Sequence, residues 1–358
     1  MAKLPNNSFE KGLLDGLEKT LAELPGVKLS RNHSLKQNDE GADAVLSIRV
    51  QGRLISVLVQ AKQSGFPRDV RNYAIHPRNI IKERRGVEAV SIIAAPSIST
   101  GGRNLLRQQG IGYFDGGGSL YLPLSNGLYF IDRQPPSGDR RLRSIYKGRS
   151  SQVIHLLLAR HDRKWHINEM AEEAQVSPYT VHQVFTSLEK QLWIERQGKG
   201  PDSVRTLREP AALLDAWSEN YSMKQFEFRN YYRWSQSLES LRKGVAEKIE
   251  KQGGEYALTL SSGAALVAPF TTNVDRLHFI VPSGLRLEDV VQAAGLKPVE
   301  DGANVIFMIS REHSPLLLRR RLKGVWVASD VQIYLDLRNW PARGKEQAAH
   351  LRKERLSY

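Results

Sequence analysis

Cysteine is absent from the 358 residues, which excludes disulfides, thiolate metal ligands and cysteine nucleophiles. The nine histidines show no paired metal-ligand spacing such as HExxH, so we expect neither a metal bound by histidine nor a cofactor. No apolar run is long enough to cross a membrane, and the first residues lack the apolar core of a signal peptide. A cytoplasmic protein without a membrane partner is expected.

Acidic residues are scarce relative to basic ones: 38 Asp and Glu stand against 52 Lys and Arg, a formal net charge of +14. Such an excess favours a polyanionic partner, because each neutralised phosphate releases condensed counterions. The simpler alternative is a soluble basic protein of no particular partner. The apolar fraction of 41% is ordinary for a globular protein, and the length predicts two or three domains.

Residues 1–135 alternate between helical and strand-like patterns, which predicts an α/β domain. Two alternating runs are joined by Gln51-Gly52 and form an expected β-hairpin. The expected helices span 9–24, about 67–85 and 101–110, and the expected strands span 42–50, 53–62, 87–96, 111–124 and 127–132.

Residues 136–149 form an expected basic linker, because Pro135, Pro136 and Gly138 break regular structure at its start. Arg140, Arg141 and Arg143 belong to this linker. A run of basic residues is usually a solvated surface, but beside a DNA-binding module such a run is well placed to follow a phosphate backbone.

Residues 150–209 are predicted to form a winged helix-turn-helix, with helices over 152–165, 167–176 and 179–193. Ser177 is the expected N-cap of the third helix, and Pro178 occupies its first position. The residues expected to contact DNA are Ser177, Tyr179, Thr180, His182, Gln183 and Thr186 on that helix, and Arg196, Lys199 and Arg205 in the basic wing. The alternative is a three-helix subdomain with a hairpin that binds protein.

Residues 210–358 are predicted to form a C-terminal α+β or α/β domain, which completes an α+β multidomain protein. We expect an aromatic-rich helix over 226–252. The segment 331–356 is expected to close the chain as a strand, a loop and a basic helix.

Asp43 opens one strand of the expected hairpin, and Gln60-Ala61-Lys62 ends the other. This spacing resembles the PD-(D/E)XK nuclease pattern, in which acidic groups bind Mg²⁺ and the lysine assists the attacking water. Gln60 replaces the second acid, as in Mrr-like restriction enzymes; Glu10 or Glu18 could supply another carboxylate. The alternative is a strand-end aspartate and a surface lysine. Asp115 is better explained as a turn residue.

The segment 103–122, RNLLRQQGIGYFDGGGSLYL, is similar to a motif of the AbiEi-type antitoxins of type IV toxin–antitoxin systems, with Ser119 where that motif has Asn. Segments 150–195, 263–270 and 331–352 also resemble this family. The resemblance implies a DNA-binding regulator that represses its own operon, with a nucleotidyltransferase-like toxin as a partner.

The main interpretation is a sequence-specific, double-stranded DNA-binding transcriptional regulator, with or without a toxin partner. Because Gln60 leaves the metal site short of negative charge, we expect a nuclease-like fold that is not an enzyme. The alternative is a Mg²⁺-dependent, Mrr-like endonuclease targeted by its winged helix. A third hypothesis is an interaction protein whose C-terminal domain binds another protein; an oligomer is left open.

Overall fold

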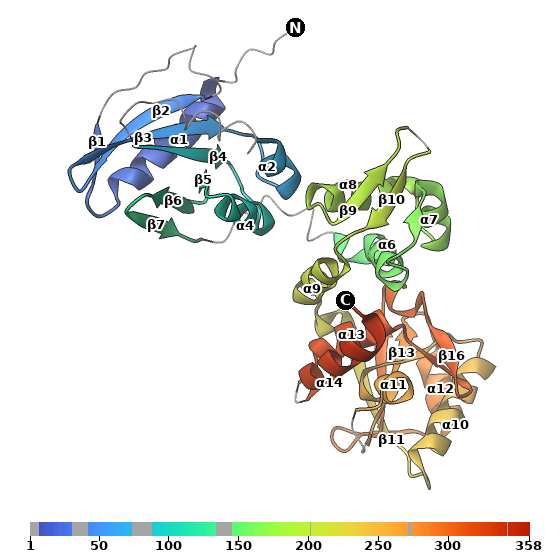
Figure 1. Cartoon of the computed structure of the whole chain (residues 1–358). Helices are drawn as coiled ribbons and strands as arrows, with labels where there is room; N and C mark the ends of the chain where they lie inside the picture. Colours follow the sequence, from blue (N-terminus) through green and yellow to red (C-terminus); the bar gives the residue numbers. More distant parts are fainter. Residues whose placement is uncertain are drawn as a thin grey trace. The chain divides into compact units, whose positions relative to one another are not determined.

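The computed structural model describes residues 7–30, 42–73, 88–133, 145–200, 202–270, 274–341 and 343–358 (Figure 1). The chain divides into two compact units: Met1–Arg141 with Glu189–Leu192, and Leu142–Leu188 with Trp193–Tyr358. The domain boundaries drawn from the sequence stay predictions. The expected fold class is confirmed, since both units contain helices and sheets.

The first unit is built on a seven-stranded sheet whose strands follow one another in sequence order. β3, β4 and β5 are parallel neighbours, and the remaining neighbours are antiparallel. The strands are β1 Val27–Ser30, β2 Ala44–Val50, β3 Arg53–Ala61, β4 Glu88–Ala95, β5 Gly112–Asp115, β6 Leu120–Leu124 and β7 Gly127–Ile131. β1 is the one strand of this sheet that the sequence patterns did not predict.

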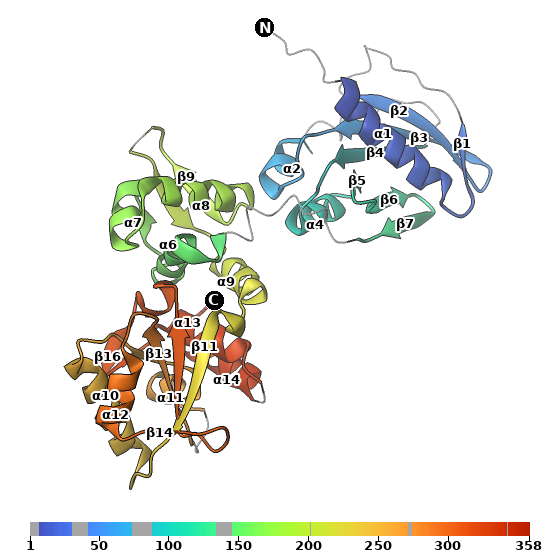
Figure 2. The same cartoon turned by 180° about the vertical axis from the view of Figure 1, so that it is seen from behind.

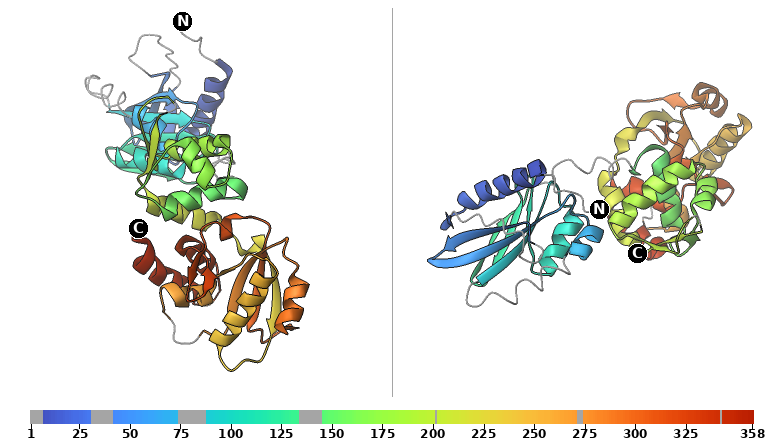
Figure 3. Two further views of the ribbon diagram at one scale, coloured as in Figure 1. Left: turned by 90° about the vertical axis from the view of Figure 1, so that its right-hand side faces the viewer. Right: turned by 90° about the horizontal axis from the view of Figure 1, so that it is seen from above.

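Helices cover both faces of this sheet (Figure 3). α1, Asn7–Ala22, buries Leu17 and Leu21 against one face. α2, Pro67–Tyr73, and α4, Thr100–Gln108, bury Val70 and Leu106 on the other face. α2 ends at Tyr73, and the rest of the helix expected over 67–85 lies outside the described residues.

A buried ion pair joins α4 to the turn after β5. The Arg103 guanidinium donates to Asp115, and both side chains are almost wholly shielded from solvent. Asp115 Oδ1 also accepts hydrogen bonds from the amides of Gly117 and Ser119, at 2.9 and 3.2 Å. The sequence-based interpretation of Asp115 as a turn residue agrees with these bonds.

The second unit begins with a winged helix-turn-helix, as predicted. Its helices are α6 Gly148–Ala159, α7 Ile167–Glu173 and α8 Pro178–Lys190, and its strands are β8 Lys164–Trp165, β9 Ile194–Gln197 and β10 Val204–Leu207. The three strands form a sheet in the order β8-β10-β9. The β9–β10 hairpin extends beyond the helices as the wing (Figure 1).

The rest of the second unit surrounds a seven-stranded mixed sheet in the order β14-β11-β15-β13-β12-β17-β16 (Figure 2). These strands are β11 Phe226–Tyr232, β12 Ala257–Leu258, β13 Leu277–Pro282, β14 Lys297–Pro298, β15 Val305–Ser310, β16 Arg320–Leu322 and β17 Val325–Val327. The helices are α9 Pro210–Asn220, α10 Leu238–Lys251, α11 Leu260–Val267, α12 Leu287–Ala294, α13 Asp330–Arg338 and α14 Gly344–Leu351. Shorter elements are the 3-10 helices η1 Met223–Gln225 and η2 Ser314–Leu316 and the π-helix η3 Arg352–Leu356.

Two elements of this region differ from expectation. The aromatic segment that starts the helix expected over 226–252 is the strand β11, and only its later part forms α10. The strand expected at 331–337 is the helix α13. Val331 through Leu337 are all buried, so α13 lacks the polar face that would have revealed a helical period.

The helix-turn-helix and the C-terminal fold share one hydrophobic core. α6 is buried on all sides, and His155 at its centre bonds to the Ser314 carbonyl at 3.0 Å and to the Ser329 hydroxyl at 2.5 Å. Burial lowers the pKa of His155 to about 4. In the described part of the chain, no helix is both long and apolar enough to cross a bilayer.

Candidate functional site

Asp43, Gln60 and Lys62 come together at one end of the β2–β3 hairpin. The two-residue turn at Gln51-Gly52 has positive φ at both positions, 50° and 81°, as a type I′ turn requires. This tight turn sets the register, in which Ala44 pairs with Val59. Asp43 therefore lies opposite Gln60, on the sheet face away from α1, and Lys62 follows on the same face.

Backbone hydrogen bonds fix the positions of these residues. The Asp43 amide donates to the Val59 carbonyl at 2.9 Å, and Asp43 Oδ2 accepts from the Ala61 amide at 2.7 Å. The Lys62 amide donates to the Ala94 carbonyl of β4 at 2.7 Å. The carboxylate and the lysine are thus held by the sheet itself rather than by a loose loop.

The three side chains differ in their exposure to solvent. Asp43 is exposed, Gln60 is 5% exposed, and Lys62 is half-buried. Lys62 Nζ lies 5.2 Å from the centre of the Tyr73 ring, a cation–π distance. Burial and the charge of Asp69 raise the pKa of Tyr73, so its ring stays neutral beside the ammonium group. The cluster combines one carboxylate, one amide and one ammonium group.

This donor set matches a hard cation such as Mg²⁺, though with little negative charge. Asp43 offers a carboxylate and Gln60 an amide oxygen, and Mg²⁺ commonly binds one or two carboxylates together with waters and substrate phosphates. Among the described residues, no group of three or more His, Asp or Glu side chains could hold a metal. The residues therefore fit a metal whose remaining ligands are water and phosphate oxygens.

α1 brings its first turn toward the same end of the sheet. The helix ends close to β1, which pairs with the far end of β2 through Val27 and Val50. A helix of 16 residues is about 24 Å long, similar to a strand of seven residues. Glu10 in that first turn is therefore at the Asp43 end of the domain, on the side covered by α1; Glu18 lies two turns further away.

The second candidate surface is the exposed face of α8. Ser177 caps this helix as predicted, because its hydroxyl accepts from the Thr180 amide at 3.2 Å. Tyr179 is 71% exposed, His182 and Gln183 are also exposed, and Thr180 and Thr186 are half-buried. The opposite face buries Val181, Val184, Phe185 and Leu188. The polar residues expected to read DNA thus form one solvent-facing surface.

Of the three cations expected in the wing, two are exposed and one is buried. Arg196 and Lys199 are exposed on and after β9. Arg205 is only 4% exposed, donates to the carbonyl and hydroxyl of Ser203 at 3.0 and 2.7 Å, and lies over the Phe185 ring at 5.6 Å. The assignment of Arg205 to DNA was wrong, because the alternation of β10 turns this residue into the core. Arg140, Arg141 and Arg143 of the expected linker lie outside the described residues.

The sequence analysis missed one contributor to the Asp43 cluster and one buried polar cluster elsewhere in the fold. Tyr73 was part of an expected basic helix, and nothing in its spacing pointed to Lys62. A buried polar cluster around Asp336 was also missed, because 331–337 was interpreted as a strand. Tyr221 Oη donates to Asp336 at 2.5 Å, Gln332 donates to the same carboxylate at 2.8 Å, and Thr259 donates to its other oxygen.

Comparison with known proteins finds neither a matching family model nor a matching curated protein. Two similar solved structures are a repair endonuclease from Pyrococcus abyssi and EndoMS in its apo form. The sequence identities are 16% and 18%, and the TM-score is 0.21 for both. Each match covers 32% of this chain and about half of the matched chain, 48% and 47%.

The comparison corrects one expectation and leaves another unsupported. The similarity to a repair endonuclease contradicts the expectation that the chain is not an enzyme, and at a TM-score of 0.21 it shows no activity of this chain. The AbiEi-type resemblance gains no support, since no family model matches. The chain spans about half the length of the structures it matches, so an activity of the whole protein is a matter for proposal.

Proposed function

We propose that this protein binds double-stranded DNA and cleaves it as a metal-dependent endonuclease, with the winged helix as its DNA-binding module. The observation that carries the proposal is the convergence of Asp43, Gln60 and Lys62 on one face of the first sheet, with Asp43 tied to the Ala61 amide at 2.7 Å. A carboxylate, an oxygen donor and an ammonium at this spacing are what hydrolysis of a phosphodiester needs.

Each residue has a distinct role in the proposed reaction. Asp43 and the amide oxygen of Gln60 would hold Mg²⁺, which when bound polarises the phosphate and acidifies a water molecule. Lys62 would donate to a non-bridging phosphate oxygen and stabilise the charge that develops in the transition state. The Tyr73 ring and the bond from the Lys62 amide to Ala94 hold the lysine at the end of β3.

The winged helix supplies DNA binding in this proposal. Gln183 is exposed on α8 and can pair bidentately with adenine in the major groove. Arg196 and Lys199 on the wing would contact phosphates, which gives affinity without sequence information. The formal charge of +14 favours such a polyanionic partner.

The proposal is tested by incubating the full-length protein with supercoiled plasmid and Mg²⁺ or Mn²⁺, with EDTA as the blank. Nicked and linear products that require the metal support the proposal, and no product with either metal contradicts it. Asp43→Asn removes the carboxylate charge at an exposed position, so it should abolish cleavage while leaving plasmid binding intact.

A second candidate function is transcriptional regulation, and the exposed polar face of α8 favours it independently of the first sheet. As a regulator, the protein would bind an operator through its winged helix, as the AbiEi-type resemblance implies. A nucleotidyltransferase-like toxin would then be encoded beside the gene for this protein. Genome-wide mapping of bound DNA tests this candidate. Occupancy at a few promoters, including that of the protein's own gene, supports regulation; scattered occupancy without promoter preference contradicts it.

A further inference from the structure

An exposed aromatic surface lies on the C-terminal sheet, away from α8 and the wing. Phe228 is 37% exposed and Tyr232 is 41% exposed, and both lie on the same face of β11 because they are four residues apart in one strand. Trp340, after α13, lies with its ring 5.9 Å from that of Phe228. We call Phe228, Tyr232 and Trp340 the aromatic platform.

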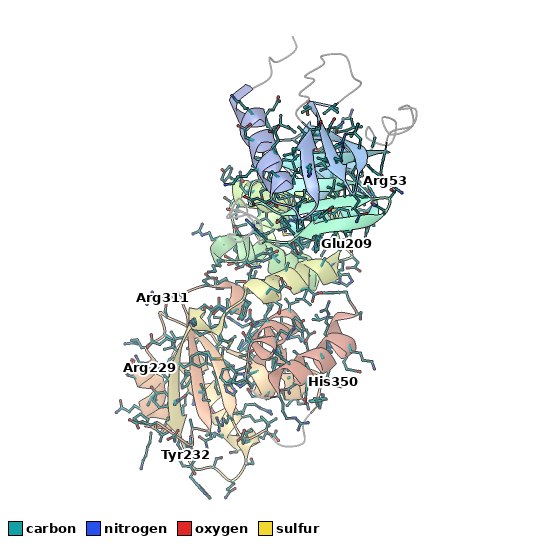
Figure 4. The ribbon with its side chains drawn as sticks, turned by 90° about the vertical axis from the view of Figure 1, so that its left-hand side faces the viewer. Arg53, Glu209, Arg229, Tyr232, Arg311 and His350 are labelled. Carbon is teal, nitrogen blue, oxygen red and sulfur yellow. The ribbon has the colours of Figure 1, made fainter. Side chains whose placement is uncertain are left out.

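The platform is both accessible and firmly supported. β14 pairs only with Tyr231 and Tyr232, so within the described residues no strand covers the outer side of 226–229. Figure 4 shows Arg229 and Tyr232 on β11 at the margin of the sheet. Beneath the platform, the buried His278 ring packs edge-on against Trp340 at 5.4 Å.

Three exposed cations lie close to Trp340 in the sequence, at the end of α13 and the start of α14. Arg338, Arg343 and Lys345 are all exposed and lie within five residues of Trp340. Glu346 is the one acid between residues 338 and 353, and it pairs with Arg343 at 3.2 Å. The chain on both sides of Trp340 therefore carries a net positive charge, whereas a surface for an apolar protein segment would gain nothing from these cations.

We propose that the aromatic platform binds single-stranded nucleic acid. Exposed aromatic rings stack on bases of any sequence, and nearby cations attract the phosphates between those bases. The three cations provide the charge complementarity that selects a polyanion over a peptide strand added to the edge of β11. The platform is separate from the α8 surface, and the proposal does not depend on DNA cleavage.

The test uses fluorescein-labelled oligothymidine and a mixed-sequence duplex of equal length, in EDTA, with the full-length protein. Phe228→Leu and Tyr232→Leu keep an apolar side chain but remove the stacking ring. Each substitution should raise the Kd for oligothymidine about fivefold or more, because stacking contributes about 1–3 kcal/mol per base. The Kd for the duplex should not change.

Phe130→Leu is the matched control, because Phe130 is an aromatic residue 45% exposed on the edge strand β7 of the other sheet. It should leave the Kd for oligothymidine unchanged. An unchanged Kd in the Phe228→Leu/Tyr232→Leu double variant would overturn the proposal, and so would equal losses of oligothymidine and duplex binding.

A charge variant tests the same surface without touching the rings. Arg343→Gln with Lys345→Gln changes only exposed side chains and should not unfold the protein. If both cations contact phosphates, the salt dependence of oligothymidine binding should lose about 1.4 units of slope, because a single-stranded phosphate contact contributes about 0.7. An unchanged slope would contradict the placement of the phosphates beside Trp340.

Discussion

The Asp43 carboxylate accepts a hydrogen bond at 2.7 Å from the backbone amide of Ala61, the residue that separates Gln60 from Lys62 in the chain. This bond joins the start of β2 to the end of β3 at the point where the two strands part. Lys62 is held in turn by β4 through its own amide. A carboxylate and a lysine positioned by three neighbouring strands form the kind of rigid arrangement that a catalytic site needs.

Gln60→Glu should create a stronger metal site. Gln60 is buried, so a glutamate at this position lowers the stability of the fold when no counter-charge is present. The same glutamate strengthens the binding of a divalent cation. We expect the variant to have a lower Tm than the wild type in EDTA and a larger rise in Tm on addition of Mg²⁺, because a ligand of the folded state stabilises it.

Gln108→Glu, at an exposed position of α4, is the control for the added charge. Thermal unfolding with and without Mg²⁺ compares the two variants. A Gln60→Glu protein whose Tm responds to Mg²⁺ no more than that of Gln108→Glu would remove Gln60 from the site.

Gln183→Ala should weaken binding to a specific DNA site and relax the preference at one base pair. A bidentate contact between glutamine and adenine discriminates by about 1–3 kcal/mol. Gln292→Ala, an exposed glutamine on α12, is the control and should bind as the wild type does. Selection from a random oligonucleotide pool measures the preference; identical preferences in both variants would show that α8 does not read the sequence.

The wing cations and Arg205 should behave differently. Arg196→Ala or Lys199→Ala should weaken binding to all duplexes alike and lower the salt slope by about one unit, since each is exposed. Arg205→Ala should instead lower the stability of the second unit by roughly 1–3 kcal/mol, because it removes a buried, hydrogen-bonded side chain. Salt titrations and urea unfolding separate the two effects.

The buried carboxyl of Asp336 should make stability depend on pH. Burial raises the pKa of Asp336 from 3.8 to about 7, against the lowering effect of the donors Thr259, Tyr221 and Gln332. Between about pH 4 and pH 7, the folded state therefore retains a proton that the unfolded state has lost. The contribution of Asp336 to the free energy of unfolding is fully present below pH 4 and is lost as the pH rises through 7. Asp336→Asn should abolish it.

Urea unfolding at pH 5 and pH 7.5, followed by tryptophan fluorescence, measures this dependence. All six tryptophans belong to the second unit, so the signal reports the part of the chain that contains Asp336. His155 and His278, each with its pKa lowered to about 4, oppose the effect by destabilising the fold as the pH falls below 6.5. The difference in pH dependence between the wild type and Asp336→Asn gives the contribution of the Asp336 carboxyl to the free energy of unfolding. Equal pH dependence in the two proteins would show that Asp336 is ionised at both pH values.

The sequence predicted the Asp43 cluster because local rules determine it. Gln51-Gly52 specified a two-residue turn, and that turn alone aligns Asp43 with Gln60. The capping of α8 by Ser177 was also predictable, since a hydroxyl before a proline at the first helical position is a local signal. Tyr73 was not, because its approach to Lys62 depends on how α2 packs on the sheet.

The remaining errors come from segments whose burial does not follow the usual helix or strand period. α13 is buried from Val331 to Leu337, with the polar residues Gln332 and Asp336 also inside, so the polar face that distinguishes a helix from a strand is missing. β11 was interpreted as a helix because its exposed aromatic residues break the alternation expected of a half-buried strand. Arg205 lies in the basic segment that suggested a wing, and its burial comes from tertiary packing over the Phe185 ring of α8, which the sequence pattern does not show.

The most direct test of the central claim is plasmid cleavage by the wild type, Lys62→Ala and Lys28→Ala at equal DNA occupancy. Lys28 is an exposed lysine on β1 of the same sheet, so Lys28→Ala controls for the loss of one positive charge. We expect metal-dependent nicking by the wild type and Lys28→Ala, and a loss of at least a hundredfold in Lys62→Ala, because one group that stabilises transition-state charge contributes about 10²–10³ in rate. Cleavage by Lys62→Ala at the wild-type rate, or none by the wild type with Mg²⁺ or Mn²⁺, would contradict the account.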